Sequence, residues 1–223
     1  MTKNTPIVQG MFPTPVYIIK RNSNSVRGAH ARSDLTSGEE KEIEKIIKEG
    51  MHMNSGNSSS NNSHIFDSPY FSVNGNLEKI KQFCEQQLKI YVEELIIPRE
   101  EIEVYITQSW LNITKPGGFH HKHFHVNSII SGVFYISTEE DDRIVFTDPN
   151  FNLKHVLRIE PKEFNVWNSS ICASPSITNE LILFPSWMNH RVEPNEKATT
   201  DRISISFNTF VKGTLGSRDG LTE

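Results

Sequence analysis

Six short runs rich in β-branched and aromatic residues fill the second half of the chain, from Ile102 onward. Each run is bounded by Pro, Gly, Asn or Asp, the residues that end strands and form turns. So many short strands within about 110 residues predict a barrel or a sandwich. In chain order the runs are EVYITQSWLNIT, SIISGVFYIS, RIVFTD, HVLRI, ELILFPS and RISISFNTF.

The first hundred residues predict a smaller part that contains helices. Residues 38–48 and 76–96 place apolar side chains at helical spacing, and FPTPVYII reads as a strand. Residues 22–34 and the polar run 53–63 are expected to be exposed connections, the second of them a linker or a lid. We therefore expect one domain over 1–223, with 1–100 as an N-terminal extension and 101–212 as a β core. The stripe of the longer helix would consist of Leu77, Ile80, Phe83, Leu88, Ile90, Tyr91 and Leu95.

Composition narrows the possible partners. The net charge is -4 and the 23 Lys and Arg are scattered, so no nucleic-acid surface is evident. No apolar run approaches the roughly 20 residues of a spanning helix, and the N-terminus lacks a secretory pattern, so we expect a cytoplasmic protein without a membrane partner. Cys84 and Cys172 lie in unrelated segments and predict neither a disulfide nor a metal pair. The expected partner is a small molecule or a peptide, and the sequence does not indicate an oligomeric state.

Four of the nine histidines gather in GGFHHKHFH, directly before the strand-like NSIISGVFYI. On an extended chain, alternate side chains share a face, so His121, His123 and His125 would point together. The same parity would carry Asn127, Ser131 and Tyr135 onto that face. Imidazole suits iron, copper, nickel or zinc, so this face could be a metal site inside a barrel. The alternative is a solvated, histidine-rich turn.

His190 and the last strand add to this pattern. His190 follows an apolar strand that ends in a Pro-Ser-Trp turn, which would aim its side chain inward. In RISISFN, alternation puts Arg202, Ser204, Ser206 and Asn208 on one face and Ile203, Ile205 and Phe207 on the other. A guanidinium beside a hydroxyl is suited to binding a carboxylate. The alternative is an edge strand whose polar face meets water.

The joint pattern resembles a family of iron(II)/2-oxoglutarate oxygenases seen in phages and bacteria and related to prolyl hydroxylases. The segments that carry the resemblance are FPTPVY, WLNITKPGGFHHKHFH, NSIISGVFYI, LFPSWMNHRVEP and RISISFN. The resemblance implies a mainly β fold, a double-stranded β-helix of jelly-roll or cupin type, with N-terminal helices packed on the sheet. It also implies bound Fe(II), with 2-oxoglutarate as cosubstrate and release of succinate and CO2.

When the functional positions of the family are matched to this sequence, the resemblance implies that the metal is bound by His123, His125 and His190, which also act in catalysis. It makes Arg202 and Ser204 the holders of the distal carboxylate of 2-oxoglutarate, with Tyr135 and Asn112 as secondary contacts.

The sequence departs from the wider superfamily in one respect, because no Asp or Glu lies two residues after any histidine of the cluster. Three ligand sets therefore stay open. The preferred set has three histidines, His123, His125 and His190. A second set uses His121 with His123, and a third uses only His125 and His190 with Asn127 or water.

Three functions are compatible with this site: a 2-oxoglutarate-dependent hydroxylase of peptide side chains or small molecules, a cupin-like module that binds a metal or carboxylate without turnover, and a three-histidine dioxygenase without 2-oxoglutarate. Arg202 and Ser204 argue against the last, because a site without a dicarboxylate needs no buried guanidinium.

Overall fold

The computed structural model describes residues 10, 12–21, 34–49, 52–53, 58–60, 77–150 and 159–216. Its helical elements are few and precede the long strands. They are α1 (Ser37–Glu49), α2 (Glu78–Tyr91) and the π-helical turn η1 (Val92–Ile96). The strands are β1 (Tyr17–Lys20), β2 (His52–Met53), β3 (Ser58–Ser60), β4 (Ile102–Thr114), β5 (His120–His123), β6 (Ile130–Ser137), β7 (Arg143–Thr147), β8 (Ile171–Pro175), β9 (Glu180–Pro185), β10 (Asn189–Val192) and β11 (Arg202–Gly213).

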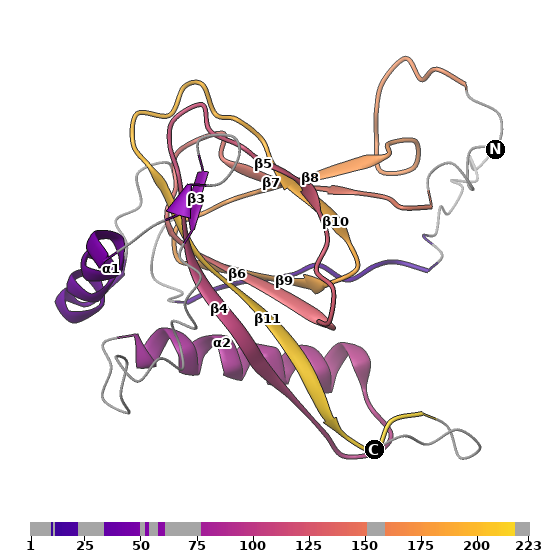
Figure 1. Ribbon diagram of the computed structural model, residues 1–223. Helices are drawn as coiled ribbons and strands as arrows, with labels where there is room; N and C mark the ends of the chain where they lie inside the picture. Colours follow the sequence, from indigo (N-terminus) through magenta and orange to yellow (C-terminus); the bar gives the residue numbers. More distant parts are fainter. Residues whose placement is uncertain are drawn as a thin grey trace, which may run out of the picture.

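Two antiparallel sheets form the molecule. The large sheet has the order β1-β9-β6-β11-β4-β3-β2, and the small sheet has the order β5-β10-β7-β8. Figure 1 shows the two sheets facing each other, with β5, β7, β8 and β10 opposite β6, β9, β4 and β11. The prediction of a mainly β, jelly-roll type of fold is therefore confirmed.

The large sheet is covered on both of its faces. Its outer face packs against α2 and α1 around Phe134, Leu183 and Phe207, which are fully or almost fully buried. Figure 1 shows α2 lying along this face. Its inner face joins the small sheet in a second apolar cluster that includes Tyr135, Phe146, Phe184 and Met188. The interior between the sheets is thus part apolar core and part polar site.

Strand β11 forms the centre of the large sheet and separates these two environments. It pairs with β4 over its whole length and with β6 over its first half. Ile205 and Phe207 pack into the outer core, whereas Arg202, Ser204 and Asn208 are polar residues with little exposure. The alternation expected from RISISFN is therefore present, and its polar face is buried rather than solvated.

Several expectations for the N-terminal part need correction. The long helix changes to a π-helical turn at Val92 and ends before Ile97, whose φ is 50°. Leu95 is consequently 46% exposed and does not belong to the apolar stripe. Within the polar run, Ser58–Ser60 forms a strand against β4 rather than a loop, because the edge of β4 offers unpaired backbone groups.

Other expected segments lie outside the described residues. They are most of the connection 22–34, most of the run 53–63, and HVLRI apart from its last residue. In the described part of the chain, no helix is both long and apolar enough to cross a membrane. Cys84 is buried and Cys172 exposed, and both are free thiols.

Candidate metal centre

Strand pairing in the small sheet sets two of the histidines opposite each other. His190 of β10 lies directly across from His123 of β5, so both side chains leave the sheet on the same face. His190 is buried and packs edge-on against the ring of Phe184, with 4.8 Å between ring centroids. Both rings therefore point into the space between the sheets.

His125 reaches the same place from a turn, not from a strand. Strand β5 ends at His123, and Asn127 adopts a φ of 55° in the turn that leads to β6. The His125 backbone N–H donates to the Ser186 carbonyl oxygen over 3.0 Å, which ties this turn to the residue directly after β9. The expectation of unbroken alternation from His121 to Tyr135 fails at Asn127, which is exposed in this turn, whereas Ser131 and Tyr135 are buried on the inner side as expected.

The ring nitrogens of His123, His125 and His190 form a group able to hold a metal, with one ligand atom from each residue within 4.8 Å of the others. The ring centroids of His123 and His190 are 4.3 Å apart, and each lies 5.1 Å from that of His125. The structure therefore brings together the three histidines of the preferred ligand set, and it also places His121 beside His123, as the second set requires. Among the described residues, the groups with metal-binding geometry contain no carboxylate.

Hydrogen bonds to Nδ1 fix the orientation of all three rings. The Nδ1 of His190 lies 3.0 Å from the Met188 carbonyl oxygen, and that of His123 lies 2.9 Å from the His121 carbonyl oxygen. The Nδ1 of His125 contacts the amide oxygen of Asn208. Each Nδ1–H can donate to its oxygen, which leaves each Nε2 lone pair for a metal, as in many metal sites whose ligands are oriented by outer hydrogen bonds.

A buried polar network holds the Asn208 side chain in turn. The Ser131 hydroxyl donates to the Asn208 amide oxygen over 3.1 Å and lies 3.0 Å from the His125 ring. Ser131 and Ser186 share a further hydrogen bond of 2.8 Å. Sequence analysis placed Ser131 and Asn208 on inward faces but gave them no role, because only the turn at Asn127 brings His125 back to them.

The environment keeps these histidines neutral. Burial lowers the pKa of His190 to about 3, and repulsion from His123 adds to this effect. Burial also lowers the pKa values of His123 and His125, although hydrogen bonds partly oppose the shift. A neutral imidazole has the free lone pair that metal ligation requires.

Arg202 lies within electrostatic reach of the histidines and is already paired. Its Nη1 donates to Asp142 Oδ1 over 3.1 Å, and the side chains of both residues are at most 6% exposed. The Asp142 carboxylate also accepts hydrogen bonds from the Asn195 side chain and from the Glu139 backbone N–H. The buried guanidinium was predicted from the sequence, but Asp142 was not. In the sequence Asp142 is one of four consecutive acidic residues, 139–142, which resemble an exposed turn.

The other predicted residues lie on strands next to Arg202. Ser204 of β11 is opposite Asn112 of β4 on one side and Tyr135 of β6 on the other. Burial raises the pKa of Tyr135 to about 12, so its hydroxyl stays protonated and can donate. The Asn112 side-chain nitrogen donates to the Ser206 hydroxyl over 2.9 Å, while its oxygen is buried without a partner.

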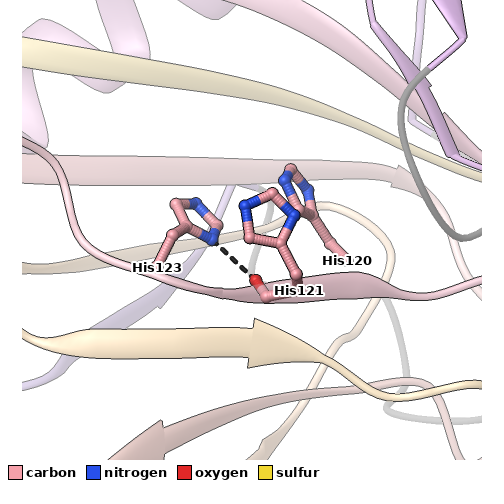
Figure 2. A group of neighbouring side chains, drawn as sticks. All are labelled: His120, His121 and His123. Carbon is pink, nitrogen blue, oxygen red and sulfur yellow. Dashed lines mark hydrogen bonds between the residues drawn. The ribbon is translucent and has the colours of Figure 1, made fainter.

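A second group of histidines borders the first. His120, His121 and His123 also place one ligand atom each within 4.8 Å of the others, and His121 is exposed. Figure 2 shows the three rings on the same side of β5. His123 thus belongs to both groups.

Comparison with known proteins bears on this site. Residues 108–208, which include every histidine and anchor residue discussed above, match the family model described as "Putative 2OG-Fe(II) oxygenase". The β core is similar to iron(II)/2-oxoglutarate oxygenases. No curated protein matches the chain in sequence.

Solved structures of such enzymes share the fold. A prolyl hydroxylase from Trichoplax adhaerens, in complex with a hypoxia inducible factor peptide fragment, has a TM-score of 0.53 at 11% identity and covers 87% of this chain and 83% of its own. The epimerase SnoN from nogalamycin biosynthesis has a TM-score of 0.50 at 9% identity, and the match covers 80% of this chain and 76% of the epimerase. A Pseudomonas putida prolyl-4-hydroxylase has a TM-score of 0.48 at 13% identity, and the match covers 82% of this chain and 92% of the hydroxylase. At 11% and 9% identity, the likeness to the first two structures shows the fold alone.

Proposed function

We propose that this protein is an Fe(II)/2-oxoglutarate-dependent oxygenase that hydroxylates a peptide side chain or a small molecule. The observation that carries the proposal is the group of His123, His125 and His190 between the two sheets, where the hydrogen bond at each Nδ1 leaves Nε2 as the nitrogen that can face a metal. The match of residues 108–208 to the oxygenase family supports the same reading.

The donor set fits a divalent iron ion. Three neutral imidazoles on one side of an ion leave its remaining positions open for a cosubstrate and oxygen. When bound, iron with 2-oxoglutarate and oxygen supplies the oxidation of a substrate C–H bond, with succinate and CO2 as coproducts. The chain's own contribution is to orient the rings through Met188, His121 and Asn208, and to exclude water with the rings of Phe184 and Phe146 beside His190.

Arg202 is our proposed anchor for the distal carboxylate of 2-oxoglutarate. The hydrogen bond to Asp142 uses Nη1 and fixes the plane of the guanidinium, a group with five N–H donors in all. Ser204 and the protonated Tyr135 would add hydroxyl donors from the two neighbouring strand positions. In the orientation shown, Asn112 Nδ2 keeps one N–H beyond the bond to Ser206; a turned amide would accept from Ser206 O–H at Oδ1 and offer both N–H groups to the carboxylate.

The test is spectroscopic and chemical. Anaerobic addition of Fe(II) and 2-oxoglutarate should produce a visible metal-to-ligand charge-transfer band, and oxygen should then yield succinate. Absence of both the band and succinate, with a broad panel of peptides and small molecules, would show that the protein is not an oxygenase of this class.

Two variants separate the roles. His190→Ala should abolish iron binding, whereas Arg202→Ala should weaken 2-oxoglutarate binding and leave iron bound. Arg191→Ala is the matched control, because the Arg191 side chain pairs with Glu193 at the surface of the same small sheet. Unchanged affinity for 2-oxoglutarate in Arg202→Ala would show that the anchor assignment is wrong.

One observation favours an alternative, a cupin-like module that binds a metal or carboxylate without turnover. The charge of Arg202 is already balanced by Asp142, so the buried ion pair could be structural. The two functions differ in a direct measurement, since the module would bind Fe(II) without forming succinate.

A further inference from the structure

We propose that His120, His121 and His123 form an outer site for a divalent transition-metal ion, and that this site passes the ion to the inner group through the shared His123. The inner group is defined by His123, His125 and His190. The entry role rests on the proposed function of the inner group as the resident metal site. The outer site itself rests on geometry alone.

A β-bulge creates the outer group. Between β10 and β5, His190 pairs with His123 and Val192 pairs with His120, so three residue steps on β5 oppose two on β10. Regular alternation would turn His120 to the opposite face from His121 and His123. The extra residue brings the His120 side chain back to the inner face, a re-aiming that bulges commonly produce beside functional sites.

The three rings have the spacing and chemistry of a metal site. The ring centroids of His120 and His123 are 4.6 Å apart and the rings are stacked, while His121 lies 5.0 Å and 5.4 Å from them. Figure 2 shows the three rings gathered on one side of the strand. Imidazole nitrogens at such spacing suit Co(II), Ni(II), Cu(II), Zn(II) or Fe(II).

Sharing of His123 makes the two groups alternatives. Its Nδ1 is engaged with the His121 carbonyl oxygen over 2.9 Å, so only Nε2 is free to bind an ion. One nitrogen lone pair can hold one ion at a time. An ion bound by His120, His121 and His123 can therefore exchange the first two ligands for His125 and His190 without leaving His123.

The two groups differ in exposure in the direction that an entry site requires. His121 is exposed and His120 is half-buried, whereas His190 is 5% exposed and packs against Phe184 and Phe146. A hydrated ion reaches the outer group first and loses its water in steps. The inner group, whose rings are fixed by Met188 and Asn208, should bind the ion more tightly.

The outer site can be tested with Co(II), whose absorption bands report coordination. His190→Ala removes one inner ligand and should still bind one Co(II) with lower affinity. Adding His120→Ala and His121→Ala to this variant should remove that ion. If His190→Ala binds no Co(II), or if the triple variant retains it, the outer site is refuted. His125→Ala serves in place of His190→Ala if circular dichroism shows that the latter does not fold.

The entry role is tested by the rate of loading. The double variant His120→Ala/His121→Ala should keep the equilibrium affinity of the inner group, while Co(II) association in stopped flow slows by about tenfold, a typical change among variants of one binding site. Lys122→Ala, an exposed neighbour on the same strand, should load at the wild-type rate. Loading of the double variant at the wild-type rate, or two ions bound per wild-type chain, would overturn the proposal.

These outcomes are distinguishable from failure of the proposed function. If the wild-type chain loads Co(II) through the outer site but makes no succinate with Fe(II), the oxygenase assignment fails and the entry site stands. If the wild-type chain makes succinate but the double variant loads Co(II) at the wild-type rate, the oxygenase assignment stands and the entry site fails.

Discussion

The two sheets have different surroundings, and they carry different parts of the candidate site. The large sheet is buried on both faces, since its outer side packs against α1 and α2 around Phe134. The small sheet shares its inner face with the core, but β8 is mostly exposed, with Ile171 at 45%. The candidate metal ligands His123 and His190 lie on the small sheet, whereas the proposed anchor Arg202 lies on the large one. The sheet that is buried on both faces thus carries the proposed carboxylate anchor, and the more exposed sheet carries two of the candidate metal ligands.

The largest expected effect tests this difference in stability. Phe134→Ala removes a fully buried ring that packs edge-on against Phe83, and should lower the free energy of unfolding by about 3–5 kcal/mol. Ile171→Ala on the small sheet should cost about 0.5 kcal/mol, as at most exposed positions. Chemical denaturation measures both. Equal costs would show that the two sheets contribute equally to the stability.

The next effect concerns the ion pair at Arg202. Asp142→Asn leaves a buried guanidinium without its counter-ion and should destabilise the protein by about 3 kcal/mol. Asp141→Asn is the matched control, because the Asp141 side chain meets Lys197 and Arg143 at the surface. Thermal unfolding compares the two variants. If both cost the same, Arg202 is better solvated than its burial indicates.

A smaller effect is expected in metal binding. Asn208→Ala removes the oxygen that orients His125 and should weaken metal affinity by about 10- to 100-fold. Gln108→Ala removes only a 3.3 Å contact to the far side of the same amide, and should leave the affinity nearly unchanged. Co(II) titration measures both. His190 permits no such variant, since its orienting partner is the backbone of Met188.

The smallest effect lies at a solvent-accessible turn. Hydrogen bonds from Thr200 and Thr199 lower the pKa of Glu139 to about 2, from an ordinary value of 4.5. A pKa that is lower in the folded state stabilises the fold above pH 4.5, and this contribution is lost as the pH falls from 4.5 to 2. Glu139→Gln should therefore be less stable than wild type at pH 7 and equally stable near pH 2. Glu140→Gln, with a carboxylate outside this set of hydrogen bonds, should show no such convergence.

Periodicity predicted the longer strands because each of them carries its own signal. The alternation in RISISFN and the apolar run ELILFPS correspond to β11 and β9. Strands β8 and β10 were not predicted, because ICASP and NHRV are short and mix polar with apolar residues. Their pairing depends on β7, which lies between them in the small sheet. Such tertiary pairing overrides weak local preference.

The site was predictable in its residue types but not in its geometry. The cluster in GGFHHKHFH and the position of His190 indicated a metal site, and the structure brings His123, His125 and His190 together. The bulge in β5 and the turn at Asn127 were not predictable, because the bulge depends on pairing with β10 and the turn is held by a contact with Ser186. The pairing of Asp142 with Arg202 links residues 60 positions apart. No local pattern distinguishes this acid from its three neighbours.

The positions of the three histidines along the chain have a consequence for the whole β core. His123 and His125 lie near the start of the β core and His190 near its end, so an ion bound to all three closes most of that core into a loop. An ion that binds only the folded form stabilises that form by the free energy of binding, which the unfolded chain does not gain. A bound ion would then act as a reversible cross-link. Removal of the ion by a chelator should lower the stability of the β core, as reduction lowers that of a disulfide-bonded domain.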